Sequence, residues 1–393
     1  MQTQLPEALL ATERGRRAEE ILRSCVHCGF CNATCPTYQV AGDELDGPRG
    51  RIYLIKGLLE GDTQDSRVNQ HLDRCLTCRA CETTCPSGVA YGELLEIARH
   101  ESTDDRAWWR RLLVVALKQV VPRRALFRSM LRLGHWFKPL LPAALRGKLP
   151  PLPKPKSVRV DVRQRKVIVL QGCVQSVTTP EVVENLTALL DRHGIEPVLL
   201  AEEGCCGALP LHLGDERAAS RAARHNVAAV APHLMNVEAI VSSASGCGVT
   251  VKDYARLLPE DGDAQRLAAK CMDAAEYLSQ LDLPLEPTLA ARRIAWSPPC
   301  TLQHGQQSRG HVEALLTRAG YELVPVRDSH LCCGSAGTYS VLQPEMADTL
   351  RERKLETLME PGPDVIATAN VGCHTHLAQA AEIPVKHWLE LVR

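Results

Sequence analysis

The chain has 393 residues, which exceeds one ordinary domain and suits two or three. Apolar residues make up 45% of it and charged residues 23%, as in globular proteins, and this composition excludes disorder as the main state. Basic and acidic residues both number 46, so the zero net charge argues against a protein that binds nucleic acid. The unusual feature is the number of cysteines, which is 17.

The cysteines and the apolar runs indicate the compartment. The first twenty residues lack an apolar core, and the longest apolar run in the basic middle of the chain, residues 112–117, has six residues. A membrane-spanning helix needs about 20. We therefore predict a cytoplasmic protein without a secretory signal or a membrane span. In that compartment, closely spaced cysteines bind metal more often than they form disulfides.

Two cysteine runs near the N-terminus share the spacing C-x2-C-x2-C-x3-C-P, which is typical of ferredoxins that bind two [4Fe–4S] clusters. Three closely spaced thiolates hold three irons of one cluster, and the fourth cysteine, which precedes proline, reaches the other cluster. Structural zinc is a poorer match, because zinc sites separate two CxxC pairs by roughly a dozen residues or more. The spacing predicts a first cluster site (Cys25, Cys28, Cys31, Cys85) and a second cluster site (Cys35, Cys75, Cys78, Cys81).

The segments between and after the two runs are predicted to be helical. The gap of 39 residues between the runs is too long for a hairpin, so we expect a helical ferredoxin-type domain over residues 1–104. His27 and His71 lie near the runs, but eight thiolates already fill two clusters, so packing or hydrogen bonding is their expected role. The expected helices cover residues 51–59, 68–76 and 93–100.

The C-terminal half contains a repeat with an offset of about 127 residues. A cysteine, 31 further residues and then Cys-Cys-Gly occur twice, and one more cysteine follows after 40 residues in the first copy and 39 in the second. Buried-strand patterns alternate with helical ones, which predicts a duplicated α/β domain with parallel sheets over residues 161–285 and 286–393. The cysteines define a first-repeat site (Cys173, Cys205, Cys206, Cys247) and a second-repeat site (Cys300, Cys332, Cys333, Cys373). The expected strands cover 166–170, 197–200, 239–242, 293–297, 322–326 and 365–368, and the expected helices 180–193 and 345–358.

Each repeat places its cysteines at the carboxyl ends of predicted strands, where open α/β sheets bind ligands. Four thiolates could hold one further iron–sulfur centre per repeat, and an adjacent cysteine pair also suits dithiol redox chemistry. The sequence leaves these alternatives open. His304, His374 and His376 lie near the same strand ends as candidate ligands, hydrogen-bond donors or proton carriers, with packing as the default. Cys271 has no counterpart in the other repeat, and we interpret it as a structural residue in a helical stretch.

Residues 106–160 hold fourteen Lys and Arg, no Asp or Glu, and five aromatic residues. We expect a basic helical connector over residues 105–160 that includes a stiff proline-rich linker at 149–155. Basic helices with Trp and Leu bind anionic membrane surfaces or acidic partner subunits, and a solvated connector is the simpler alternative. An apolar helix face (Leu112, Leu113, Ala116, Val120, Val121) is expected opposite a basic one (Arg110, Arg111, Lys118).

The two runs and the two Cys-Cys-Gly repeats together resemble the iron–sulfur subunits of flavin-dependent 2-hydroxy-acid dehydrogenases, over about residues 15–390. Heterodisulfide reductase subunits, the iron–sulfur subunit of anaerobic glycerol-3-phosphate dehydrogenase and lactate-utilisation proteins share this pattern. The flanks of the repeated cysteines are most similar to those of glycolate oxidase iron–sulfur subunits. The stretches that carry this narrower resemblance are Gly172–Gln175, Cys205–Leu209, Ser245–Gly248, Thr301–Gln306 and Cys332–Ser340.

The resemblance implies an electron-transfer subunit of a membrane-associated glycolate oxidase. FAD-containing partner subunits would oxidise glycolate to glyoxylate, and this chain would pass the electrons to a quinone or another acceptor. The resemblance also implies two [4Fe–4S] clusters on this chain, FAD on a partner subunit only, and peripheral contact with the inner face of the cytoplasmic membrane through residues 106–160. The sequence itself has no G-x-G-x-x-G fingerprint and no P-loop.

Two other classes of function compete with this reading. One is a heterodisulfide-reductase-like protein, or the iron–sulfur subunit of a lactate or glycerol-3-phosphate dehydrogenase. The fifth cysteine that ends each heterodisulfide reductase repeat is replaced here by Thr250 and His376, which argues against its disulfide chemistry. The other class is a non-enzymatic iron-sensing or scaffold protein.

Overall fold

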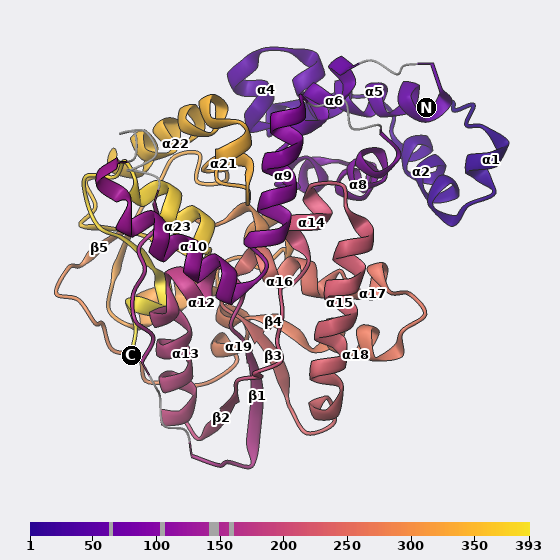
Figure 1. Ribbon diagram of the computed structural model, residues 1–393. Helices are drawn as coiled ribbons and strands as arrows, with labels where there is room; N and C mark the ends of the chain where they lie inside the picture. Colours follow the sequence, from indigo (N-terminus) through magenta and orange to yellow (C-terminus); the bar gives the residue numbers. More distant parts are fainter. Residues whose placement is uncertain (63–65, 103–106, 141–148, 157–160) are drawn as a thin grey trace.

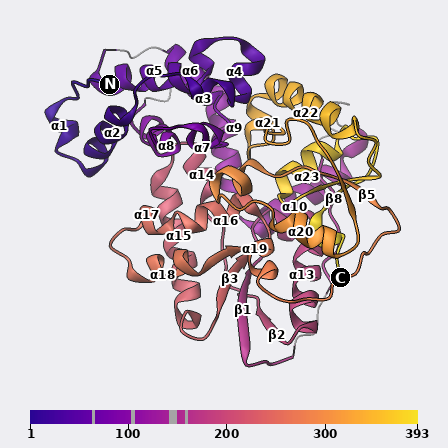
Figure 2. The same cartoon turned by 180° about the vertical axis from the view of Figure 1, so that it is seen from behind.

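The computed structural model describes residues 1–62, 66–102, 107–140, 149–156 and 161–393. A helical N-terminal domain lies at one end of the molecule, and two α/β units form the rest (Figure 1). The view from behind shows the same division (Figure 2). The predicted fold class, a helical domain followed by a duplicated α/β domain with parallel sheets, is confirmed.

The N-terminal domain consists of short helices around one apolar core. Helix α5 starts at a proline in its first turn and ends at Gly61, and its residues Ile52, Ile55 and Leu59 lie on one buried face. That face packs against α8. Helix α6 is shorter than the prediction of 68–76, because the chain turns into the second cysteine run after Asp73. The helices are α1 (Glu7–Leu10), α2 (Glu13–Ser24), α3 (Phe30–Ala33), α4 (Pro36–Ala41), η1 (Glu44–Asp46), α5 (Pro48–Glu60), α6 (Ser66–Asp73), α7 (Ala80–Thr84) and α8 (Tyr91–Glu101).

Each repeat contains a four-stranded sheet in which all neighbouring strands are parallel. The strand order is β2-β1-β3-β4 in the first repeat and β6-β5-β7-β8 in the second, so the two topologies are the same. All six predicted strands are present, although β2 begins two residues before the predicted position. The strands are β1 (Arg165–Leu170), β2 (Ile195–Val198), β3 (Ala239–Ser242), β4 (Cys271–Asp273), β5 (Arg293–Trp296), β6 (Glu322–Val324), β7 (Val365–Thr368) and β8 (Val385–His387).

The position of Cys271 corrects one prediction. Cys271 opens the edge strand β4 and pairs with Ile240 of β3, so its assignment to a helical stretch was wrong. The preceding helix ends at Lys270, and a strand of three residues is too short to show a period of two in the sequence. The Cys271 side chain is buried in the apolar cluster that also contains Cys173, Cys205 and Cys206.

The helices of the repeats cover the two sheets, which share one apolar core. Buried side chains of β1 and β3 and of β5 and β7 belong to the same cluster, so the repeats pack as one body. Helices α13 and α22 confirm the two predicted helices. The first repeat has α12 (Gln175–Thr178), α13 (Pro180–Arg192), α14 (Ala208–His212), α15 (Glu216–Val230), η3 (Ala231–His233), α16 (Ser245–Lys252), α17 (Tyr254–Leu257), α18 (Gly262–Lys270) and α19 (Ala274–Ser279). The second has the π-helical turn η4 (Thr301–Gly305), α20 (His311–Arg318), α21 (Tyr339–Leu342), α22 (Pro344–Met359), α23 (Val371–Ala378) and η5 (Trp388–Glu390).

The basic connector contains α9 (Trp108–Val120), α10 (Arg124–Trp136) and η2 (Lys138–Leu140), and α9 and α10 cross one face of the molecule (Figure 1). Arg110 and Lys118 of α9 point inward, where they bind the Leu342 carbonyl oxygen and the Asp215 carboxylate, whereas Leu112 is exposed. Within the described residues, no helix is long and apolar enough to cross a membrane.

Candidate functional site

The first cluster site is a single pocket in the N-terminal domain. Its four cysteines line this pocket together, although Cys85 comes from the second run and the other three from the first. The loops of both runs have the same backbone form, with positive φ at His27 (59°) and Gly29 (85°) in one and at Thr77 (52°) and Arg79 (59°) in the other. The two runs therefore present their cysteines in the same way.

The second cluster site lies next to the first. Cys35 of the first run lines a pocket with Cys75, Cys78 and Cys81 of the second. Cys81 also borders the first pocket, so the two sites are adjacent. The backbone N–H of Thr77 lies 3.5 Å from the Cys75 Sγ. The structure thus brings together the cysteines of each site in the crossed combination expected from the spacing.

A buried charge network borders the second cluster site. The guanidinium of Arg51, which is 1% exposed, lies 3.9 Å from the Cys35 Sγ and 3.4 Å from the Asp46 carboxylate. Asp46 also accepts hydrogen bonds from His71 and Arg74, each at 2.8 Å. A buried arginine beside thiols favours an anionic set of sulfurs. No sequence pattern pointed to Arg51 or Asp46.

The candidate histidines bind protein groups. His71 contacts Asp46, and His304 binds Thr83 Oγ1 through Nδ1 at 2.8 Å. Nε2 of His374 donates to the Val385 carbonyl oxygen at 2.9 Å, and Nε2 of His376 donates to that of Ala347 at 3.1 Å. His27 lines the first pocket, and burial lowers the pKa of its imidazole. These contacts fit the hydrogen-bonding and packing roles expected for them.

The Cys-Cys-Gly turns depend on their glycines. Gly207 has φ 91° and Gly334 has φ 87°, which is the left-handed region that glycine adopts without strain. A Cβ at Gly207 would lie 3.0 Å from the Ala219 carbonyl oxygen, and one at Gly334 would lie 2.5 Å from that of Ala347. The turn also lets the N–H of each glycine approach the first sulfur of the pair, at 3.5 Å for Cys205 and 3.4 Å for Cys332.

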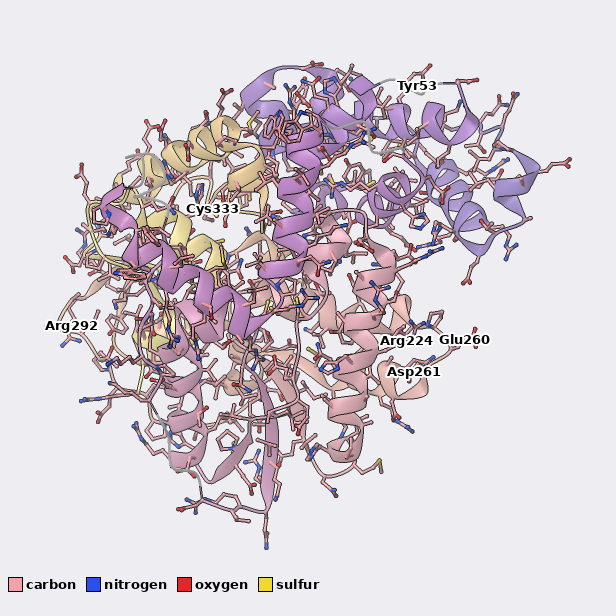
Figure 3. All side chains as sticks on the ribbon, viewed as in Figure 1. Tyr53, Arg224, Glu260, Asp261, Arg292 and Cys333 are labelled. Carbon is pink, nitrogen blue, oxygen red and sulfur yellow. The ribbon has the colours of Figure 1, made fainter. Side chains whose placement is uncertain are left out.

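The second-repeat site brings its four thiols together in the interior near Cys333 (Figure 3). The Sγ atoms of Cys300 and Cys332 are 3.8 Å apart, and the Asn370 amide donates to Cys373 Sγ at 3.9 Å. Lys354 of α22 faces this set, and its ammonium group donates to the Ser329 carbonyl oxygen at 2.7 Å. Burial lowers the pKa of Lys354 to about 8, and among the described residues no carboxylate pairs with it.

The first-repeat site takes its cation from a different element. Arg124 of the connector helix α10 forms an ion pair with Glu203 at 3.1 Å, and its charge acts on the thiols of Cys173 and Cys205. Hydrogen bonds from the thiols of Cys173 and Cys206 lower the pKa of Cys205 to about 3. Each repeat site therefore combines four convergent thiols with one cation, Arg124 (partly buried) or Lys354 (buried), a composition that suits an anionic metal–sulfur centre.

Comparisons with known proteins agree with this organisation. A family described as a 4Fe-4S dicluster domain matches residues 21–89, and a cysteine-rich domain matches residues 167–252 and 294–378. The chain is 46% identical to the glycolate oxidase iron-sulfur subunit of Escherichia coli (strain K12), over 100% of this chain and 98% of that protein. It is 30% identical to the probable glycolate oxidase iron-sulfur subunit of Bacillus subtilis (strain 168), over 91% and 88%.

One solved structure shares the fold over most of the chain. A hypothetical protein from Helicobacter pylori superposes with a TM-score of 0.57 and 8% sequence identity, covering 98% of this chain and 75% of that one. At that identity the likeness concerns the fold alone.

Proposed function

Because the chain belongs to the family of glycolate oxidase iron–sulfur subunits, we propose that it takes electrons from a partner FAD subunit that oxidises glycolate to glyoxylate. It passes them to a quinone or another acceptor. Family membership makes it an electron-transfer subunit of an oxidoreductase complex. The observation that carries the proposal is the adjacency of the two cluster sites, which share Cys81 in their linings. A flavin receives two electrons together, and iron–sulfur clusters carry them one at a time.

We assign one [4Fe–4S] cluster to each cluster site, in a ferredoxin-type domain over residues 1–104. The crossed cysteine sets and the amide hydrogen that points to the Cys75 sulfur support this assignment. Arg51 holds a fixed positive charge beside Cys35 and favours the reduced, more negative state of that site. Each Cys-Cys-Gly repeat, over residues 161–285 and 286–393, holds a further iron–sulfur centre on its four thiols, which the nearby cations Arg124 and Lys354 support.

The connector, residues 105–160, provides a surface for peripheral membrane contact. Its outer face carries nine exposed apolar side chains with exposures of 38–79%, and such a patch is unusual on a water-facing helix pair. Basic residues flank it and acidic residues are absent from residues 106–160, so it suits the anionic inner face of the cytoplasmic membrane. The outer face consists of Trp108, Trp109, Leu112, Val115, Leu126, Met130, Leu133, Trp136 and Phe137.

The test is an anaerobic pull-down of the tagged chain from native cells, followed by addition of glycolate, lactate or glycerol 3-phosphate. We expect a flavoprotein to co-purify and glycolate to produce the EPR signal of a reduced [4Fe–4S] cluster. If lactate or glycerol 3-phosphate reduces the clusters more than glycolate does, the chain belongs to another dehydrogenase. If none of the three reduces intact clusters in the presence of bound flavin, the proposed function is wrong.

The membrane contact is tested separately with vesicles. The purified chain should sediment with vesicles that contain anionic phospholipid and stay in solution with neutral ones. The double variant Trp108→Ser and Trp136→Ser should weaken this binding by roughly tenfold, since each removes a large exposed aromatic group. Equal binding of the variant and the natural chain to the vesicles would exclude this face as the membrane-binding surface.

A further inference from the structure

The second cluster site and the second-repeat site pack against the same apolar cluster. Cys78 of the N-terminal domain and Cys300 of the second repeat belong to one apolar cluster that also includes Leu76, Cys332 and Tyr339. The thiols of two different domains therefore pack against one apolar cluster.

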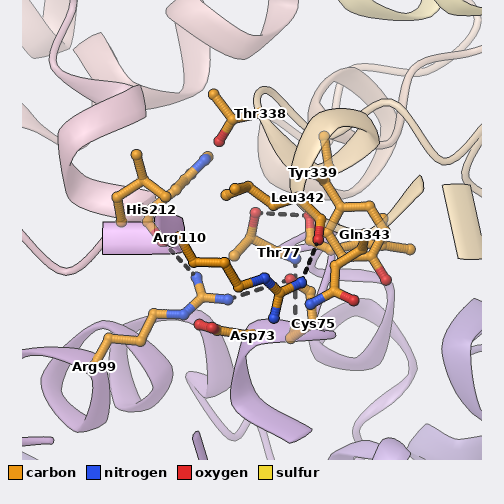
Figure 4. A pocket seen from close by; sticks show the side chains of 13 residues that line it. Asp73, Cys75, Thr77, Arg99, Arg110, His212, Thr338, Tyr339, Leu342 and Gln343 are labelled. Carbon is orange, nitrogen blue, oxygen red and sulfur yellow. Dashed lines mark hydrogen bonds between the residues drawn. The ribbon is translucent and has the colours of Figure 1, made fainter. Parts of the chain in front are cut away.

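Further contacts fix this junction. The Tyr339 hydroxyl donates to the Arg74 carbonyl oxygen at 2.9 Å, and Thr83 binds His304 at 2.8 Å. Figure 4 shows a pocket beside the junction, where Cys75, Arg110 and Tyr339 from three parts of the chain lie around one opening. Arg110 of α9 closes its rim by donating to the Leu342 carbonyl oxygen at 2.8 Å. Elements of the N-terminal domain, the connector and the second repeat thus hold the Cys78–Cys300 contact in place.

The first-repeat site has no equivalent junction. The apolar cluster that holds its cysteines contains, among the described residues, only residues of the first repeat. The N-terminal domain meets the first repeat through ion pairs, such as Arg256–Glu96 at 2.8 Å, Arg14–Glu216 at 2.8 Å and Arg79–Asp253 at 2.5 Å. Arg124 of the connector pairs with Glu203 beside the first-repeat thiols.

Building on the proposed electron-transfer function, we infer that the two repeats are not equivalent and that Cys78 and Cys300 form the electron-transfer contact between the ferredoxin-type domain and the second repeat. Across this contact one electron moves and no covalent bond changes: the Cys78 side is oxidised by one electron and the iron–sulfur centre on the Cys300 side is reduced by one. The first repeat is not in direct contact with the ferredoxin-type domain through its thiols.

The experiment compares two matched ligand variants of the full chain, Cys333→Ser in the second repeat and Cys206→Ser in the first. Both positions are the second cysteine of their Cys-Cys-Gly turn, 127 residues apart. Dithionite reduces the anaerobic protein, so the result depends neither on glycolate nor on the partner subunit. Iron content and the EPR line shape of the reduced ferredoxin-type cluster are measured.

We expect a signal broadened by magnetic coupling in the natural chain, a less broadened signal in Cys333→Ser, where only the coupling between the two ferredoxin-type clusters remains, and a signal as broad as the natural one in Cys206→Ser, with iron lost from both variants. Narrowing in Cys206→Ser but not in Cys333→Ser would overturn the inference. Unchanged iron in Cys333→Ser would also overturn it, because the second repeat would then hold no centre. Loss of the glycolate-dependent signal alone would affect the proposed function and leave this result standing.

A second pair of variants covers the case in which the serine variants do not fold. Lys354→Met and Arg124→Met remove one cation each and leave every thiol in place. Loss of a positive charge disfavours the reduced state, so each variant should lower the midpoint potential of the neighbouring centre in a redox titration. The signal that Lys354→Met shifts should be the one coupled to the ferredoxin-type cluster. If Arg124→Met shifts the coupled signal instead, the inference is wrong.

Discussion

The two repeats have the same strand order, the same left-handed Cys-Cys-Gly turn and one cation beside the thiols each, yet their surroundings differ. The second repeat takes its cation from its own helix α22 and packs its thiols against the N-terminal domain. The first repeat borrows its cation, Arg124, from the connector. Duplication therefore preserved the scaffold, and the segments packed onto it give each copy a different neighbour.

The edge strands β4 and β8 of the two repeats also differ, in the type of their last residue. The last residue of β4 is Asp273 and the last residue of β8 is His387, and each caps the helix that follows with a Glu three positions later. Both side chains are buried. One repeat thus buries an acid and the other a base at the same structural position.

The largest expected effect comes from replacing Cys78, a ligand of the second cluster site that lies next to the second repeat. Cys78→Ser should lose about four irons per chain, because it removes a ligand of the second cluster site. Iron and sulfide analysis of anaerobic protein measures this loss. Cys271→Ser is the control: Cys271 is buried in β4 outside all four sites, and its iron content should stay at the natural value. Equal losses in both variants would contradict the site assignment.

Arg51 of the N-terminal domain borders the second cluster site, where its guanidinium lies 3.9 Å from the Cys35 Sγ. Arg51→Gln leaves the Asp46 carboxylate, which is fully buried, without one of its cationic partners. We expect a loss of about 3–5 kcal/mol in the free energy of unfolding, as for other broken buried ion pairs. Anaerobic urea unfolding measures it. Arg49→Gln, which breaks the exposed pair with Glu44, should change the unfolding midpoint far less, and a similar shift in both would contradict this reading.

Asp273 and His387 should give the repeats opposite pH dependences. Burial raises the pKa of Asp273 to about 7, so its folded form keeps a proton that the unfolded form has lost, and stability falls as pH rises from about 4 to 7. Burial lowers the pKa of His387 to about 4, so the unfolded form binds the extra proton and stability falls as pH drops from 6.5 towards 4.

The matched variants Asp273→Asn and His387→Gln separate these two contributions. Urea unfolding at pH 5 and pH 8 measures the free energy of unfolding. Each substitution should remove the pH-dependent contribution of the replaced residue, on the order of 2–3 kcal/mol. Relative to the natural chain, Asp273→Asn should gain stability on going from pH 5 to pH 8, and His387→Gln should lose it. Changes of the same sign in both variants would contradict the contrast.

The smallest effect concerns two tyrosines. The Tyr339 hydroxyl binds Arg74 across the domain junction, whereas the Tyr254 hydroxyl binds the Cys206 carbonyl oxygen within the first repeat, at 2.9 Å in both cases. Each Phe variant should cost about 1 kcal/mol. Hydrogen exchange should locate the loss at residues 72–78 for Tyr339→Phe and inside the first repeat for Tyr254→Phe. Identical exchange patterns would show that Tyr339 does not hold the junction.

The sequence predicted what depends on local pattern. Strands β3 and β7 have four consecutive buried residues, and their bounds match the prediction. The crossed cysteine sets follow from spacing alone. Strands β4 and β8 were missed because three residues carry too little periodicity.

The charged groups at the sites needed the tertiary structure. Arg51, Arg124 and Lys354 lie on helices, where a charge in the sequence usually indicates a solvated face. Arg110 and Lys118 of α9 likewise find their partners at Leu342 and Asp215, far away in the chain, so the sequence pattern alone does not reveal them.

The hydrogen bond between Tyr339 and Arg74 spans 265 residues, which has a consequence for how the protein is made. A ribosome completes the N-terminal cysteines long before it reaches the helix that closes over them, at about 5–20 residues per second. During that interval the second repeat does not cover the second cluster site, because Cys332 and Tyr339 have not yet been made. The surroundings of this site are therefore complete only late in synthesis.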